Sequence, residues 1–302
     1  MRYSILTTIP FLFSLIFISQ AFAFDDDSRD DTRSPLLNTI CENNQTLTDT
    51  PTLKSSYLGD IVNLQNRNKN LIKNGKAIAQ LPVLDFKVSR NGKVYYRTRN
   101  GPFLYDESGR LKSLGGAVII YLISTQGGIV YLNDQGIVFK NGKPLNKNKG
   151  RVNYQIRESN IRGQKLFFAP NLAITQNGRA IYITDTGLLF VDNIAMSPHT
   201  ARILNFKVDS QATVFYLDNL GRLFKNTNQV VRKSFRVTTF KLNVQGQVAF
   251  LTDGKSRNLY FEDQNLSAGS QRIQDFSFTG TGEVIYRDDI GRLWKMGKLI
   301  SN

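Results

Sequence analysis

Five polar residues that follow hydrophobic segments are the first candidates for chemistry in this chain. Carboxylates gathered at one edge of a fold can bind a cation or act as an acid–base pair. Asp and Asn at such positions also form turns, because their side chains accept hydrogen bonds from nearby backbone amides. We interpret the set as turn formers: Asp218, Asp288, Asp289, Asn133 and Thr184.

A strongly basic segment at about residues 146–170 is the second candidate. Its arginines could hold phosphate or uronate groups, and its tyrosine could stack on a base or a sugar ring. The alternative is a solvated loop, or an added strand at a sheet edge where lysine discourages pairing. The predicted binding residues are Lys147, Lys149, Arg151, Tyr154, Arg157, Arg162 and Lys165.

Several kinds of chemistry are excluded by residue counts. His199 is the only histidine, so one chain cannot build a histidine-based triad or a multi-histidine metal site. Cys41 is the only cysteine, which excludes an intrachain disulfide and a cysteine pair for zinc. We therefore expect no metal, no cofactor and no catalytic residue with a linear signature. Hydrolase or lyase activity through residues gathered from separate segments stays open.

A repeating unit of about 35 residues positions these candidates from about residue 52 onward. Residues 206–226 and 276–296 carry the same landmarks 70 positions apart. Each unit has an anchor residue in its second predicted strand, and five units have a glycine five positions later. The anchors are Leu64, Tyr96, Tyr131, Tyr182, Tyr216, Phe250 and Tyr286. The glycines are Gly101, Gly136, Gly187, Gly221 and Gly291.

Each unit is predicted to form four strands. Apolar and polar residues alternate over residues 203–208, which is typical of a strand. The repeated glycine supplies the positive φ of a hairpin, and Asn74-Gly75 and Asn141-Gly142 predict tight turns into a fourth strand. One small sheet cannot bury both faces, whereas sheets placed around an axis cover one another. The expected fold is all-β: a single β-propeller of about seven four-stranded blades, with six as the alternative because the first unit is the poorest copy.

Two predicted hairpins resemble those of known propeller families. Residues 89–96 (SRNGKVYY) and 175–182 (TQNGRAIY) are similar to the hairpin of TolB-like and WD40-like bacterial propeller repeats. Those families usually carry Pro-Asp before the glycine, where this chain has Arg90-Asn91 and Gln176-Asn177. The resemblance covers about residues 51–302 and implies the propeller fold. It carries over no family's partners.

The amino-terminal residues predict export. Arg2, an apolar run over residues 9–18 and Ala21-Phe22-Ala23 form the pattern of a signal peptide over residues 1–23. The run is shorter than the ~20 residues that a membrane-spanning helix needs. Residues 24–51 begin with acidic residues and contain few apolar ones, so we expect a flexible tail before a propeller domain at 52–302. The expected location is the periplasm or the outside of the cell, with no span across the membrane.

The charge of the chain favours anionic partners. The full chain carries 39 Lys and Arg against 24 Asp and Glu, a net charge of +15, and loss of residues 1–23 leaves +14. The predicted function is a binding or scaffolding module for a macromolecule, first a protein or an anionic polysaccharide, with nucleic acid as a further option. Two alternatives stay open: a carbohydrate-active enzyme with a central pocket, and a structural component of a cell-envelope assembly. The sequence does not indicate the oligomeric state.

Overall fold

The computed structural model describes residues 53–301 apart from nine short stretches: 66–69, 80, 99–100, 112–115, 159–164, 198–199, 232–234, 255–256 and 268–271. The predicted signal peptide, the predicted tail, Arg162 and His199 lie outside the described residues. All the secondary structure of the described part is β-strand, and no helix there is long and apolar enough to cross a membrane. The predicted all-β class is confirmed.

The strands form seven antiparallel sheets of four consecutive strands each, which we call blades 1 to 7. Blade 1 is β1 (Leu53–Ser55), β2 (Ile61–Leu64), β3 (Leu71–Lys73) and β4 (Lys76–Ala79). Blade 2 is β5 (Val83–Val88), β6 (Val94–Thr98), β7 (Gly101–Asp106) and β8 (Gly109–Arg110). Blade 3 is β9 (Val118–Ile123), β10 (Ile129–Asn133), β11 (Val138–Lys140) and β12 (Lys143–Pro144). Blade 4 is β15 (Leu172–Ile174), β16 (Ala180–Ile183), β17 (Leu189–Val191) and β18 (Ile194–Ala195).

Blades 5 to 7 continue the same order. Blade 5 is β19 (Ile203–Val208), β20 (Val214–Asp218), β21 (Leu223–Lys225) and β22 (Asn228–Gln229). Blade 6 is β23 (Val237–Leu242), β24 (Val248–Thr252), β25 (Leu259–Phe261) and β26 (Gln264–Asn265). Blade 7 is β27 (Ile273–Phe278), β28 (Val284–Asp288), β29 (Leu293–Lys295) and β30 (Lys298–Ser301). A separate hairpin, β13 (Gln155–Glu158) and β14 (Lys165–Phe168), stands between blades 3 and 4 in the chain.

A stacked aromatic pair joins the second and third strands of six blades. The two rings lie directly opposite in the strand register, with centroids 4.9 to 6.0 Å apart, and each pair faces the preceding blade. Cross-strand aromatic pairs of this kind add to sheet stability beyond the area they bury. The pairs are Tyr96–Tyr105, Tyr131–Phe139, Tyr182–Phe190, Tyr216–Phe224, Phe250–Tyr260 and Tyr286–Trp294.

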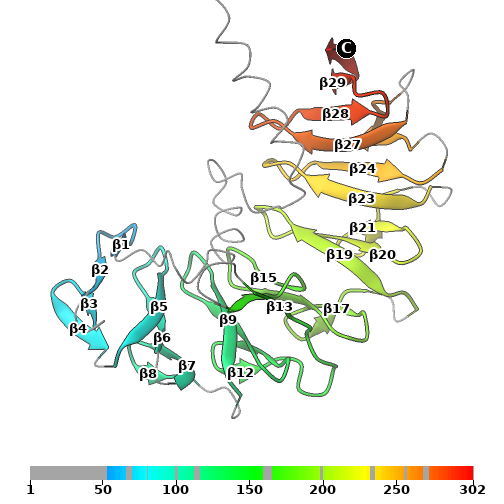
Figure 1. Cartoon of the computed structure of the whole chain (residues 1–302). Helices are drawn as coiled ribbons and strands as arrows, with labels where there is room; N and C mark the ends of the chain where they lie inside the picture. The colour runs from blue at the N-terminus through cyan, green and yellow to red at the C-terminus, as the bar shows by residue number, and fades with distance from the viewer. Residues whose placement is uncertain are drawn as a thin grey trace, which may run out of the picture.

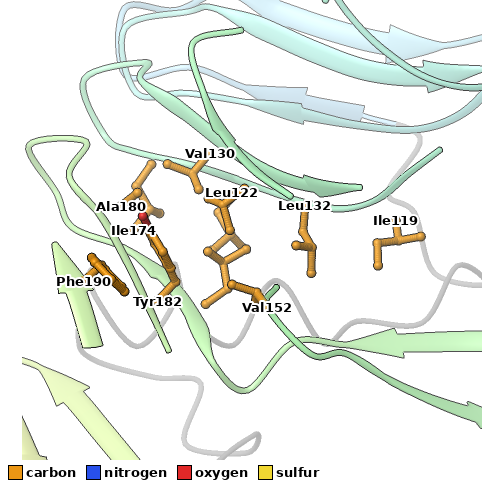
Figure 2. Packing of buried hydrophobic residues seen from close by; sticks show 11 residues of the cluster. Ile119, Leu122, Val130, Leu132, Val152, Ile174, Ala180, Tyr182 and Phe190 are labelled. Carbon is orange, nitrogen blue, oxygen red and sulfur yellow. The ribbon is translucent and has the colours of Figure 1, made fainter. Parts of the chain in front are cut away.

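The core is divided into six apolar clusters, and each cluster is formed by two consecutive blades. Figure 2 shows the cluster between blades 3 and 4, which contains Val130 and Leu132 of blade 3 and Ala180 and Tyr182 of blade 4. Full burial of one such side chain is worth about 1.5–3 kcal/mol. Each blade is therefore stabilised mainly by its neighbours in the chain.

Anchor tyrosines also link neighbouring blades through their hydroxyl groups. Tyr286 of blade 7 donates a hydrogen bond of 2.7 Å to the carbonyl of Leu266, which follows blade 6. Tyr216 donates in the same way to the carbonyl of Met196, at 3.3 Å. These bonds satisfy backbone oxygens at the ends of the short fourth strands, which buried carbonyls require.

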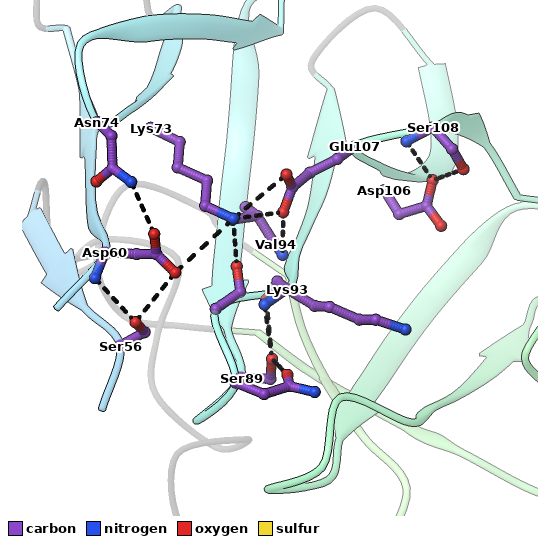
Figure 3. Close-up of polar contacts among 12 residues, drawn as sticks. Ser56, Asp60, Lys73, Asn74, Ser89, Lys93, Val94, Asp106, Glu107 and Ser108 are labelled. Carbon is purple, nitrogen blue, oxygen red and sulfur yellow. Dashed lines mark hydrogen bonds and ion pairs between the residues drawn. The ribbon is translucent and has the colours of Figure 1, made fainter. Parts of the chain in front are cut away.

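Polar side chains connect the blades at the end where the first strand turns into the second. In blade 1, the Lys73 ammonium donates to the Gly92 carbonyl at 2.7 Å and lies 3.0 Å from Glu107 of blade 2 (Figure 3). The carboxylate of Glu107 also accepts a hydrogen bond from the Val94 amide. Blade 1 is thus fixed to blade 2 by charge-assisted hydrogen bonds as well as by apolar contact.

Two predictions about the repeat are wrong in detail. In blade 1 the residue at the anchor position is Asn63, which pairs with Leu53 and Ile72, whereas Leu64 pairs with Leu71 one position further on. Within the described residues no blade comes before blade 1 in the chain. Gly101 is the second error, because it lies inside β7 and its φ is not positive. The other four repeated glycines have the expected positive φ, and the alternative of six blades is also wrong.

The blades follow one another along an open arc, with blade 1 at one end and blade 7 at the other (Figure 1). Neither end borrows a strand from the other, because both end blades are built from four strands of their own. Within the described residues, no apolar cluster joins blade 7 to blade 1.

We expect Tyr286→Phe to lower the free energy of unfolding by about 1–2 kcal/mol, because it leaves the buried Leu266 carbonyl without its donor. The matched control is Tyr260→Phe, since the Tyr260 ring stacks on Phe250 but its hydroxyl makes no hydrogen bond within the described residues. Denaturant unfolding of both variants measures the difference. Equal effects would show that the hydroxyl bond does not link the blades.

Candidate functional site: an arginine rim

The polar residues at the ends of the second strands form turns, as predicted. Asp218 is fully buried, and its Oδ1 accepts hydrogen bonds from the amides of Leu220 and Arg222. Asn133, Thr184 and Asp288 occupy the same position in blades 3, 4 and 7 and bond within their own turns. Asp289 differs, because it lies one position later and its side chain is exposed.

The Asp288 carboxylate is saturated by its own blade. Its Oδ2 accepts from Arg292 Nε at 2.8 Å and from Trp294 Nε1 at 3.0 Å, and its Oδ1 accepts from two backbone amides. Burial acts to raise the pKa of Asp288, but the hydrogen bonds from Arg292 and Trp294 outweigh it and hold the pKa below its ordinary value. An ionised, fully bonded carboxylate of this kind stabilises a turn and is not available to a substrate.

One arginine stands at the entry to each of the last four blades. In blades 5 to 7 it comes directly before the first strand, and in blade 4 it comes directly before the buried Val152. Each arginine carbonyl accepts a hydrogen bond of 2.7 to 2.8 Å from the amide of the residue three positions after the anchor residue of the same blade, so the four positions are structurally equivalent. All four side chains are exposed. We call this set the arginine rim: Arg151, Arg202, Arg236 and Arg272.

Three of these arginines lie against a turn glycine of the preceding blade. An added Cβ on Gly187 would meet the side chain of Arg202 at 2.2 Å, and one on Gly221 would meet Arg236 Cβ at 2.9 Å and its Cα at 3.1 Å. Gly136 stands in the same relation to Arg151. The glycines thus allow the positive φ of the turn and also leave room for the next blade's arginine.

The guanidinium groups of the rim are little neutralised by the described residues. Arg236 Nε lies 3.8 Å from the carboxylate of Asp253, and both side chains are largely exposed, so this pair is weak. The guanidinium groups of Arg151, Arg202 and Arg272 form no ion pair with described residues. Arginine presents a planar set of donors that binds carboxylate and phosphate groups in pairs, so the rim is suited to anionic groups.

The basic segment is an insertion at the start of blade 4. Five other blades have a β-bulge just after the first residue of the first strand, and in blade 4 the hairpin β13–β14 occupies that point, between Val152 and Asn171. Bulges accommodate extra residues because the bulged residue is already unpaired. Val152 itself is buried in the cluster between blades 3 and 4 (Figure 2).

The predicted binding residues of this segment do not all share one surface. Lys147 and Arg151 are exposed, whereas Lys149 donates to the Asn193 carbonyl at 2.6 Å and its ammonium lies over the Phe190 ring. Tyr154 is half-buried and packs against the core cluster. Arg157 and Lys165 lie in β13 and β14.

Arg202, Arg236 and Arg272 were not predicted as binding residues from the sequence. A signal was present, because each precedes the first β-branched residue of a unit, as Arg151 does. Within the described ranges, no group of three or more His, Cys, Asp or Glu side chains could hold a metal ion.

The seven four-stranded blades define a propeller-repeat protein. No protein-family model matches the chain, and no curated protein is significantly similar to it. Among solved structures, YCF48 from Cyanidioschyzon merolae is similar at 13% identity and a TM-score of 0.33, covering 80% of this chain and 93% of that one. The WD40 β-propeller domain of Doa1 is similar at 12% identity and a TM-score of 0.30, covering 78% and 88%.

A virginiamycin B lyase from Staphylococcus aureus is similar at 11% identity and a TM-score of 0.28, covering 80% of this chain and 92% of that one. Similarities at these TM-scores carry no argument about the activity of the chain.

We expect Gly221→Ala to destabilise the protein by about 1–3 kcal/mol more than Gly291→Ala, because the added methyl group crowds the backbone of the next blade. Both glycines occupy the same turn position, with φ of +76° and +89°, but nothing lies within 4 Å of a Cβ on Gly291. The backbone strain is therefore matched, and thermal or denaturant unfolding isolates the contact with Arg236. Similar losses for the two variants would contradict this account of the turn glycine.

We expect Asp288→Asn to lower stability at neutral pH by about 1–3 kcal/mol, because the amide cannot accept from both Arg292 and Trp294 as the carboxylate does. The folded-state pKa of Asp288 is lowered, so its contribution is present above the unfolded-state pKa of about 3.9 and is lost as the pH falls through the folded-state pKa. The difference between wild type and variant should shrink below about pH 4. Unfolding measured across pH tests this, with the exposed Asp289→Asn as control; a difference that did not change with pH would contradict it.

Proposed function

We propose that this chain is a binding or scaffolding module that holds an anionic macromolecular partner along the arginine rim. One observation carries the proposal: four exposed arginines occupy the same position in four consecutive blades. A partner with repeated acidic groups can contact several blades at once, and several weak contacts then add up to useful affinity. The predicted export would bring the protein to such a partner in the periplasm or outside the cell.

The direction of the strands supports a single binding edge. In an antiparallel meander, the loop that enters a blade and the turn after its second strand lie at one end, while the other two turns lie at the opposite end. Lys147 belongs to the loop that leads to Arg151, so it adds a further exposed positive charge at the same end. Anionic polysaccharides and acidic protein surfaces are the partner classes that this chemistry suits first.

The test compares two sets of four substitutions that remove equal charge from opposite ends of the blades. The rim variant changes Arg151, Arg202, Arg236 and Arg272 to Gln, and the control variant changes Lys76, Lys143, Lys225 and Lys298 to Gln. The four control lysines are exposed and lie at the turns between the third and fourth strands. Retention on immobilised heparin is measured over a series of salt concentrations, followed by titration with an oligonucleotide and an acidic protein.

The rim variant should elute at clearly lower salt than wild type, with a shallower dependence on salt, because fewer counterions are released on binding. The control variant should stay close to wild type. Equal losses in both variants would show that net charge alone drives binding and would overturn the arginine rim as the site. Absence of any retention of the wild-type protein on all three probes would overturn the proposed function.

A further inference from the structure

Four large apolar side chains are exposed in or next to blades 5 to 7, at the end of the blades where the arginine rim lies. Single exposed apolar residues are common on soluble proteins, whereas several at one edge indicate a surface that contacts a partner. The exposed fractions are 58% for Leu204, 50% for Leu220, 37% for Phe235 and 61% for Ile290.

Leu220 lies between two members of the arginine rim. The residue before it, Asn219, donates its amide to the Arg202 carbonyl at 2.8 Å. The residue after it, Gly221, lies against Arg236, whose Cβ is 2.9 Å from the place that a Cβ on the glycine would take. Blades 5 and 6 lie side by side (Figure 1). The turn of blade 5 therefore presents an exposed leucine between the arginine of its own blade and the arginine of the next.

Two further apolar side chains stand next to these arginines in the chain. Leu204 comes two residues after Arg202, and the strand register passes over it, so it is a bulged residue with no opposite residue in β20. Phe235 directly precedes Arg236, and its ring centroid lies 5.5 Å from that of Tyr260 in blade 6. Each of the two arginines thus has exposed apolar surface beside it.

The turn of blade 5 is also less acidic than the corresponding turns around it. The position three residues after the anchor is Asn219 in blade 5, but it is aspartate in blades 4, 6 and 7, as Asp185, Asp253 and Asp289. A carboxylate at this position repels an anionic ligand and attracts the arginine beside it. At blade 5, an anionic ligand meets two arginines with a neutral turn between them.

This combination of groups favours one class of anionic partner. Polysaccharides with uronate or sulfate groups, and the backbone of nucleic acids, supply anions for the arginines but no aliphatic side chains. A protein segment rich in Asp or Glu and in Leu, Ile or Val supplies both. Its carboxylates would accept hydrogen bonds from the guanidinium groups, and its aliphatic side chains would cover the exposed leucines.

We propose that the arginine rim at blades 5 and 6 binds an acidic protein segment, with carboxylates on Arg202 and Arg236 and aliphatic side chains on Leu204 and Leu220. The inference rests on the proposed function of the rim and names the partner class as protein. Burial of the two leucines adds an apolar contribution to the affinity, and this contribution is not screened by salt as the charge attraction is.

The test measures the binding of two labelled peptides of equal charge by fluorescence polarisation. One consists of Asp-Asp-Leu-Leu repeats, which place both kinds of side chain on each face of an extended chain, and the other of Asp-Asp-Ser-Ser repeats. The apolar variant combines Leu204→Ser with Leu220→Ser and keeps every charge. The control variant combines Leu58→Ser with Ile194→Ser, whose side chains are 71% and 62% exposed and lie at the opposite end of the blades.

We expect the wild-type protein to bind the leucine peptide more tightly than the serine peptide. The apolar variant should lose roughly tenfold in affinity for the leucine peptide, because about half of each leucine is exposed and available for burial. Its affinity for the serine peptide and its retention on heparin should not change, which shows at the same time that the variant is folded. The control variant should bind both peptides as the wild type does.

Equal affinity of the wild type for the two peptides would refute the inference, and so would equal losses in the apolar and control variants. Retention of the wild type on heparin in those cases would leave the rim as a site for anions in general, so the proposed function would stand. If the wild type bound neither peptide and was not retained on heparin, the inference and the proposed function would fail together.

Discussion

The structure depends on one constraint: a four-stranded sheet of this chain is apolar on both faces and cannot cover either of them itself. Six clusters meet the constraint by pairing the second-strand residues of one blade with those of the next. Because a sheet of about 35 residues buries too little area to be stable alone, contact between blades contributes more to stability than the fold of any single blade. The stacked rings, the tyrosine hydroxyl bonds and the turn glycines all act at these contacts.

The sequence predicted this organisation well wherever a residue type indicates one local structure, such as a strand or a tight turn. The spacing of Tyr96, Tyr131, Tyr182, Tyr216 and Tyr286 identified second strands, and Asn74-Gly75 and Asn141-Gly142 are tight turns with positive φ at both residues. Leu64 was taken as an anchor because it is large and apolar. Only the strand register, which depends on how the strands pair in three dimensions, could show that Asn63 holds the anchor position.

The candidate site was predicted less completely. Its residues occupy equivalent positions in different blades and are far apart in the sequence. Arg151 was found since it lies in a basic run, while Arg202 and Arg272 each stand alone among neutral neighbours. Arg236 follows Arg232 and Lys233, but this short basic stretch was not recognised as part of a site. Their equivalence rests on backbone hydrogen bonds between each arginine and the turn of its own blade. Arg151, Arg202 and Arg236 also pack against the turn glycine of the preceding blade. Each of these contacts requires glycine, because any side chain at the turn position would collide with the arginine.

Every blade is one contiguous stretch of chain, and each of its ladders is completed within that stretch. A stretch of this kind can be copied or deleted as a unit by recombination within a gene, since no strand of a neighbour would lose its partner. An added copy would only need one face that packs on the preceding blade and one face that packs on the following blade, as the existing blades have. Repeats of this design can therefore lengthen or shorten during evolution in whole steps of one blade.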